Sequence, residues 1–89
     1  MPTDFALSQN YPNPFNPSTV IRFELPRESY VSLKVYTPLG QEIKTLIDVT
    51  RSAGVYEVRF DAAGLPSGMY IYRMKAGEFV QSRRILLVR

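Results

Sequence analysis

Hydrophobic and polar residues alternate along most of the chain with a period of two. The stretch 19–25 is the clearest example, because three apolar residues are separated there by charged ones: Ile21, Phe23 and Leu25. Successive side chains of a β-strand point to opposite faces, so this alternation predicts strands with one buried and one solvent-facing side. No stretch has convincing helical spacing. The pattern is typical of antiparallel sheets.

Seven strands are expected from these runs and from the Pro and Gly residues between them, at 5–9, 19–25, 30–36, 42–49, 54–61, 69–75 and 79–88. The fourth is weakly patterned, and 44–49 also fits a short helical turn. The residues expected to face inward include Ile21, Phe23, Leu25, Val31, Leu33, Val35, Tyr56, Val58 and Phe60. About seven strands in a chain of 89 residues predict one all-β domain, an immunoglobulin-like antiparallel β-sandwich spanning 1–89. Residues 1–4 are expected to belong to a linker or to an added start of the chain.

Turn residues give two specific expectations. Gly77 lies in a short connection that can close a hairpin between the last two strands, because glycine readily adopts a positive φ. Tyr70, at the start of the penultimate strand, follows a Leu-Pro-Ser-Gly sequence and is expected to form a tyrosine corner, with its hydroxyl bonded to upstream backbone. Gly54 is expected to open the fifth strand. These residues have structural roles on this interpretation.

The composition argues against most catalytic sites. The chain has no Cys, no His and no Trp, so thiolate nucleophiles, disulfides and imidazole bases or ligands are absent. Its eight carboxylates are spread singly, and Ser32 and Lys34 share a solvent-facing strand side, where the lysine would not be desolvated. We expect no enzyme activity, no cofactor and no metal. A metal site at Asn10, Asn13, Asn16 and Asp61 is possible in principle, but Asx turns explain these residues better.

Charge and aromatic residues raise two binding alternatives. The chain carries 11 basic and 8 acidic residues, net +3, and the excess lies at its end, because 73–89 holds five basic residues and one acidic residue. Nucleic-acid binding would require exposed aromatic residues among these charges, and only Phe79 follows Tyr72. Carbohydrate binding could use exposed tyrosines on a sandwich, with candidates Tyr11, Tyr30, Tyr36 and Tyr72. No apolar run is long enough to span a bilayer, and the first residues lack the pattern of a signal peptide.

The final strand departs from simple alternation. After Arg84 both of its sides are apolar, with Ile85 and Leu87 on one side and Leu86 and Val88 on the other. A two-layer sandwich buries only one of these sides. We therefore expect an apolar strip with basic neighbours outside the core at the carboxyl-terminal edge, where such patches often bind a partner. The alternative is that a loop or the N-terminal segment covers the strip.

Four stretches together resemble the type A C-terminal sorting domain of the type IX secretion system, also called the Por secretion system. They are Asn-Tyr-Pro-Asn-Pro-Phe-Asn-Pro-Ser-Thr at 10–19, Leu-Lys-Val-Tyr with Leu-Gly at 33–40, Leu-Pro-Ser-Gly-Met-Tyr at 65–70, and Arg-Arg-Ile-Leu-Leu-Val-Arg at 83–89. The sandwich is also similar to the Ig-like domain of flagellar hook-capping proteins, a likeness that concerns the fold alone.

The resemblance implies a non-catalytic signal for secretion of an N-terminal cargo protein. It implies recognition by the type IX translocon in transit through the periplasm, removal by a sortase with cleavage before Phe5, and final localisation at the outer-membrane surface or outside the cell. The expected partner-recognition residues are Arg83, Arg84, Ile85, Leu86, Val88, Arg89, Ser67 and Gly68. The expected structural signature is Asn13, Pro14, Phe15, Asn16, Pro17, Gly54, Leu65, Tyr70 and Gly77. Arg84 and Arg89 stand where the family commonly has Lys, which keeps the charge but changes the donor geometry.

Two other functional classes stay open at this stage. An apolar sheet edge also suits a self-associating module of an extracellular assembly, whereas a sorting signal is expected to be monomeric alone. An accessory carbohydrate-binding domain would use its tyrosines and would tolerate loss of the C-terminus.

Overall fold

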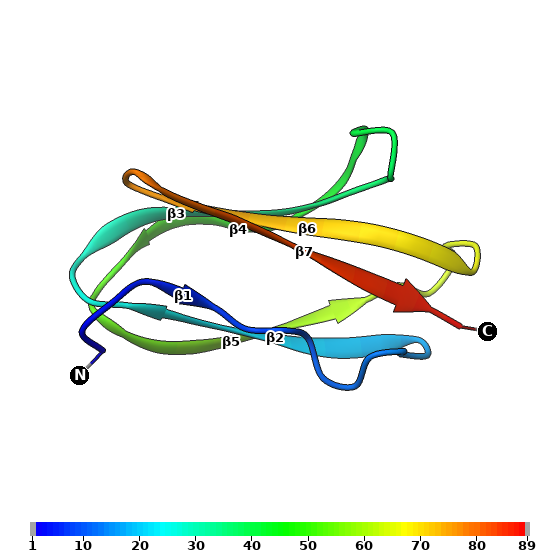
Figure 1. Cartoon of the computed structure of the whole chain (residues 1–89), viewed down its shortest axis with the longest axis horizontal. Helices are drawn as coiled ribbons and strands as arrows, with labels where there is room; N and C mark the ends of the chain where they lie inside the picture. Colours follow the sequence, from blue (N-terminus) through cyan, green and yellow to red (C-terminus); the bar gives the residue numbers. More distant parts are fainter. Residues whose placement is uncertain (1, 89) are drawn as a thin grey trace.

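The computed structural model describes residues 2–88, in which seven strands form two facing antiparallel sheets (Figure 1). One sheet has the order β1-β2-β5, and the other has the order β4-β3-β6-β7. The strands are β1 (Ala6–Leu7), β2 (Ser18–Leu25), β3 (Ser29–Tyr36), β4 (Glu42–Arg51), β5 (Gly54–Asp61), β6 (Gly68–Ala76) and β7 (Phe79–Leu87). The prediction of an all-β sandwich is confirmed. Within the described residues, no helix is present that is long and apolar enough to cross a membrane.

The core lies between the two sheets and contains most of the residues expected from the alternation, together with inward residues of β6 and β7 and with Leu7, Phe15 and Ala62. The inward sides of β2 and β3 are completely buried. Phe60 is also buried, whereas Tyr56 and Val58 are partly buried and pack against the core from the rim. The ring of Tyr56 stacks on that of Phe23, with centroids 5.2 Å apart. Burying a side chain such as Phe23 contributes about 1.5–3 kcal/mol, so these strands supply much of the stability of this small domain.

Two strands differ from their predictions. β1 covers only Ala6–Leu7, because Gln9 and Asn10 interrupt the pairing with β2 before it resumes at a single bridge between Tyr11 and Val20. β4 is an extended strand through Arg51, so the helical-turn alternative for 44–49 is wrong. Its register against β3 shifts twice, which explains why its hydrophobic alternation is weak in the sequence.

Both expected turns are present. Tyr70 is buried and its hydroxyl donates a hydrogen bond of 2.5 Å to the carbonyl of Pro66, which is the predicted tyrosine corner. Ala76 pairs with Phe79 across a two-residue connection in which Gly77 has a φ of 61°. A residue with a Cβ is strained at this φ, so glycine fits the hairpin.

The proline-rich segment between β1 and β2 is fixed by side-chain hydrogen bonds. Asn10 is buried, and its Nδ2 donates to the carbonyl of Pro12 and to Oγ1 of Thr19, each at 3.0 Å. The peptide bonds preceding Pro12, Pro14 and Pro17 are cis. At the end of β5, Oδ1 of Asp61 accepts a 3.0 Å bond from the amide of Ala63, which is the predicted Asx turn. The Asx turns expected at Asn10 and Asn13 are not formed, because the side-chain amide of Asn10 donates to the Pro12 carbonyl and the side chain of Asn13 binds β7.

Candidate partner-recognition surface

The terminal half of β7 and Val88, which directly follows it, divide their apolar side chains between the core and the surface. Ile85 and Leu87 are each 1% exposed, whereas Leu86 and Val88 are 43% and 47% exposed. This arrangement arises because all four residues are apolar while the sandwich covers only the inner side of the sheet. The prediction of exposed apolar side chains at this edge is confirmed.

The exposed side chains continue onto the neighbouring strand. Met69 is 40% exposed and pairs with Leu86, and Ile71, which pairs with Arg84, is partly buried. Residues paired directly across antiparallel strands project their side chains to the same face. We call Met69, Ile71, Leu86 and Val88 the outer strip.

Basic side chains lie beside the outer strip on the same face. Arg84 is exposed between Leu86 and the hairpin end of β7, and Arg73 and Lys75 follow Ile71 along β6. Nε of Arg73 donates to Oγ of Ser82 at 3.1 Å, and the guanidinium lies 5.3 Å from the centre of the Tyr36 ring. The ion pairs found among residues 2–88 do not involve these three cations.

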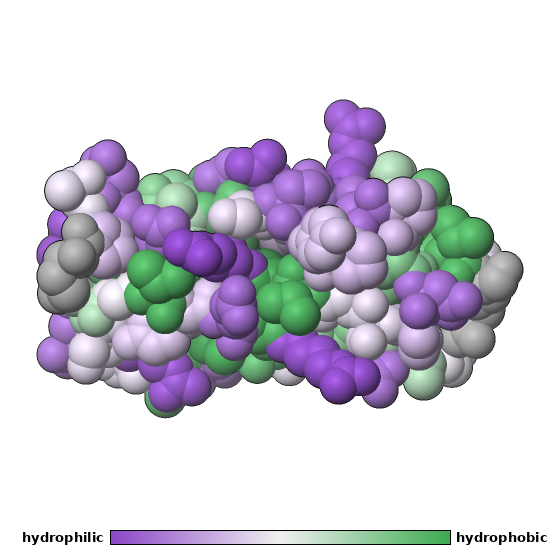
Figure 2. All heavy atoms as spheres, turned by 90° about the horizontal axis from the view of Figure 1, so that it is seen from below, coloured by the Kyte–Doolittle hydropathy of each residue, from purple (hydrophilic) through white to green (hydrophobic). Residues whose placement is uncertain are grey.

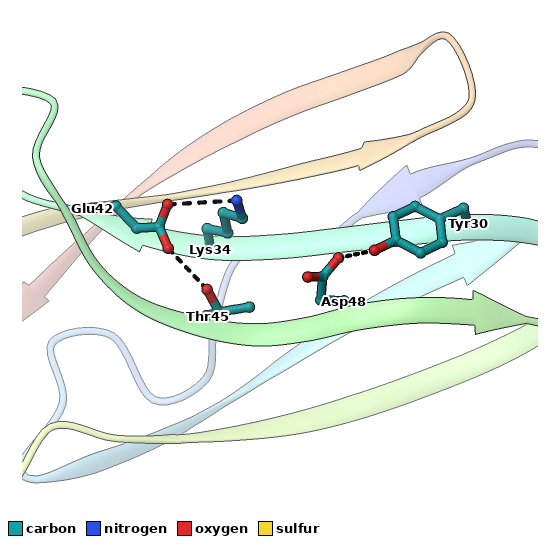
Figure 3. A network of polar contacts seen from close by, with 5 residues as sticks. All are labelled: Tyr30, Lys34, Glu42, Thr45 and Asp48. Carbon is teal, nitrogen blue, oxygen red and sulfur yellow. Dashed lines mark hydrogen bonds and ion pairs between the residues drawn. The ribbon is translucent and has the colours of Figure 1, made fainter.

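Acidic groups on this face lie on the far strand and are engaged there (Figure 3). Glu42 of β4 is 3.5 Å from Nζ of Lys34 and accepts a 2.9 Å bond from Thr45. Tyr30 donates to the carboxylate of Asp48, and this bond raises the pKa of the tyrosine. The face therefore has paired charges over β3 and β4 and a basic, apolar region over β6 and β7.

The backbone edge of β7 beside the outer strip is covered by the N-terminal segment. Residues 9–15, which we call the clasp, run along this edge at the end of the molecule where β7 ends (Figure 1). The amide of Phe15 donates to the carbonyl of Leu86, and the amide of Val88 donates to the carbonyl of Phe15, both at 3.0 Å. Oδ1 of Asn13 accepts a 3.0 Å bond from the amide of Leu86, and Nε2 of Gln9 donates to the carbonyl of Arg84 at 2.7 Å.

Phe15 anchors the clasp in the core. Its side chain is 2% exposed, and its ring centre lies 5.8 Å from that of Phe60. It forms a parallel bridge with Leu87. The alternative in which the N-terminal segment covers the strip is therefore wrong, because the clasp covers the backbone edge of the terminal strand while the outer strip stays exposed.

Arg83 has a different environment from Arg84. Its Nε donates a 3.0 Å bond to the carbonyl of Leu7, so this side chain links β7 to β1 across the two sheets. Beside it, the hydroxyl of Tyr72 donates to the carbonyl of Ser8. Burial raises the pKa of Tyr72 to about 12, against the smaller opposing effects of a backbone hydrogen bond from Asn10 and of the positive Arg83.

The other predicted residues lie in several parts of the molecule. Ser67 is exposed and Gly68 pairs with Leu87, so both lie at the same end as the outer strip. The structure thus brings together the opening, second and terminal signatures. Gly54 and Gly77 lie far from these signatures. Gly54 pairs with Leu25, and Gly77 lies in the hairpin at the other end of β7. Four more members of the signature are found in loops: Pro14, Asn16, Pro17 and Leu65. Arg89 lies outside the described residues.

Sequence reasoning did not identify Gln9 or the contact made by Asn13. Each bonds a residue more than 70 positions away, and neither belongs to a regular strand. The segment has no hydrophobic periodicity that could have indicated this docking. The two-sided apolar pattern of β7 was no signal for it either, because the outer apolar side stays exposed and the segment binds the backbone edge instead.

The tyrosines proposed for carbohydrate binding do not form one platform. Tyr11 is 82% exposed beside the three-stranded sheet, Tyr30 is exposed on the outer face of the other sheet, and Tyr72 is buried. A shallow groove of about 350 Å³ lies beside Tyr11 and is also lined by Ser8, Gln9, Val20, Arg22 and Glu57. Figure 2 shows the face of the three-stranded sheet, where apolar patches are small and separated by hydrophilic side chains.

Comparison with known proteins identifies one family. The family model described as a secretion system C-terminal sorting domain matches residues 9–88. Neither the curated proteins nor the solved structures gave a match. The matched region begins in the clasp and ends at the last residue of the outer strip.

Proposed function

The chain belongs to the family of type IX secretion C-terminal sorting domains, and from this premise we propose that the secretion machinery recognises it at the terminal half of β7. The domain serves as a non-catalytic C-terminal sorting signal, which directs an attached N-terminal cargo to the cell surface or the extracellular space. The observation that supports the location of the recognition site is the exposure of two adjacent apolar side chains, Leu86 and Val88, beside the basic side chain of Arg84 at the carboxyl-terminal end of β7.

In this proposal, the residues of the terminal half have distinct roles. Leu86 and Val88 supply affinity through burial of their apolar surface against the partner, at about 25 cal/mol per Å². Arg84 orients the complex through its charge. Ile85 keeps the strand docked in the core, and Arg83 positions it by binding the Leu7 carbonyl. Ser67 and Gly68 border the same surface.

We also propose that a sortase removes the domain by cleavage before Phe5. Phe5 is the first residue with clear packing, because its ring stacks on Phe79 with centroids 5.4 Å apart. Thr3 and Asp4 are exposed and precede the first strand. Cleavage there would leave β1 and the clasp intact on the released domain.

The test is to fuse the domain to the C-terminus of a fluorescent protein that carries a signal peptide. The fusion is expressed in a type IX-competent bacterium and in a strain lacking the translocon. We expect fluorescence on the surface or in the medium of the competent strain only. Equal distribution in both strains would contradict the sorting function.

Sedimentation of the purified domain addresses self-association, and concentration-dependent oligomers would favour an assembly module instead of the expected monomer.

A further inference from the structure

We infer that the partner binds the side chains of the outer strip on the outer face of the sheet, a mode that we call face-on recognition. We also infer that the partner is a protein surface with an apolar groove bordered by carboxylates. This inference rests on the proposed function and adds the chemistry of the partner. The alternative is β-augmentation, in which a partner strand pairs with the edge of β7. The structure distinguishes these modes because the edge and the face of β7 have different surroundings.

The edge beside the outer strip is already paired. The clasp binds the carbonyls of Arg84 and Leu86 and the amides of Leu86 and Val88. A partner strand could pair with these groups only after the clasp had left. Release of the clasp would expose Phe15 to solvent and would break the hydrogen bonds that hold the clasp to β7.

Binding to the outer face of β6 and β7 does not require the clasp to leave. Met69, Leu86 and Val88 project from it and are available to a groove of complementary shape. Three apolar side chains of this size suit insertion into a groove, as in other recognition modes that use alternating anchors.

The charges around the strip indicate the second property of the partner. Arg73, Lys75 and Arg84 adjoin the strip, and the ion pairs among residues 2–88 do not neutralise them. A purely apolar partner would remove water from these cations without replacing it, which is unfavourable. Carboxylates placed opposite them would restore the lost interactions and fix the orientation of the bound domain.

The charge prediction is tested with the same export reporter. The double variant Arg73→Glu and Arg84→Glu is expected to lower export at least tenfold, whereas Arg84→Lys retains most of it. The matched control is Arg22→Glu with Arg59→Glu, which reverses two charges on the outer face of the three-stranded sheet and is expected to export normally. Thermal melting of the purified domains verifies that each variant folds. Normal export of the folded Arg73 and Arg84 double variant would overturn the carboxylate assignment.

The face-on mode is tested by locking the clasp. Phe15 and Leu87 are bridge partners with buried side chains, and neighbouring strands lie about 4.8 Å apart, within the range that a disulfide spans. The chain has no Cys, so Phe15→Cys with Leu87→Cys would create a single possible pair. We expect the oxidised double variant to be exported as well as the two single variants. Loss of export in the oxidised double variant alone would show that the clasp must open, and would overturn face-on recognition.

A second pair of variants covers the case in which these core substitutions prevent folding. Gln9→Ala with Asn13→Ala removes two clasp bonds without touching the core. Face-on recognition predicts export no higher than that of the unaltered domain, whereas edge pairing predicts an increase. Failure of the inference differs from failure of the proposed function, because in the former the unaltered domain is still exported only by the competent strain.

Discussion

Replacing Phe15 with Ala tests whether the clasp is an integral part of the fold. Phe15 connects the proline-rich segment to the core, where its ring packs against Phe60 and its backbone pairs with the strand that carries Leu86 and Val88. The substitution removes the buried ring and leaves the backbone hydrogen bonds of the clasp without their anchor. We therefore expect loss of global stability together with local opening at the end of β7.

The magnitude follows from the burial of the ring. Truncating a fully buried Phe to Ala costs about 3–5 kcal/mol, and Phe15 is 2% exposed. A domain of this size has a total unfolding free energy of about 5–15 kcal/mol, so the variant loses a large share of it. At about 4–8 °C per kcal/mol, the melting temperature should fall by at least about 12 °C.

The assay combines urea denaturation with amide hydrogen exchange. Phe79→Ala is the matched control, because Phe79 is a partly buried aromatic residue at the end of β7 far from the clasp. We expect Phe15→Ala to lower the unfolding free energy more than the control does. It should also accelerate exchange at the amides of Leu86 and Val88, which bond to the clasp. A loss below about 1 kcal/mol, which is the range of a single hydrogen bond, together with unchanged exchange at both amides would refute the docked clasp.

Two further predictions concern tyrosines of β6. Tyr70→Phe removes the hydrogen bond to the Pro66 carbonyl and should lower the unfolding free energy by about 0.5–1.5 kcal/mol, seen as a lower urea midpoint at constant slope; an unchanged midpoint would contradict the tyrosine corner. The pKa of Tyr72 is raised from its ordinary value of 10.0 to about 12 in the folded state, so its contribution to stability is complete below pH 10 and is lost as the pH rises toward 12. Urea titrations between pH 9 and 12 should therefore show a steeper alkaline decline for the unaltered protein than for Tyr72→Phe, and parallel curves would show that the hydroxyl titrates normally.

The sequence predicted the sandwich because its central strands bury one side and expose the other. In β2 and β3 this difference between the two sides appears directly as alternation. The same reasoning predicted the outer strip, since a strand apolar on both sides cannot bury both in two layers. It was less successful for β4, where the register shifts mix the two sides, and for β1, which Gln9 and Asn10 shorten.

The clasp could not be predicted from local patterns. Its bonds join residues such as Asn13 and Leu86, which are 73 positions apart, and its residues follow no period. Composition indicated only that Asn and Pro favour irregular turns there. The tertiary contact arises because β7 lies at the edge of its sheet. The side chain of Asn13 and the backbone of Phe15 form hydrogen bonds with the backbone groups that this edge leaves unpaired.

Export of variants in the outer strip tests the central claim most directly. Leu86→Ser with Val88→Ser replaces the two exposed apolar side chains, and Val80→Ser is the matched control, because Val80 is exposed on the same face of the same strand but lies near the hairpin. Fused to the reporter in a competent host, the double variant should remain in the periplasm while the control reaches the surface or the medium. Equal export of the folded double variant and the control would contradict recognition at the terminal half of β7.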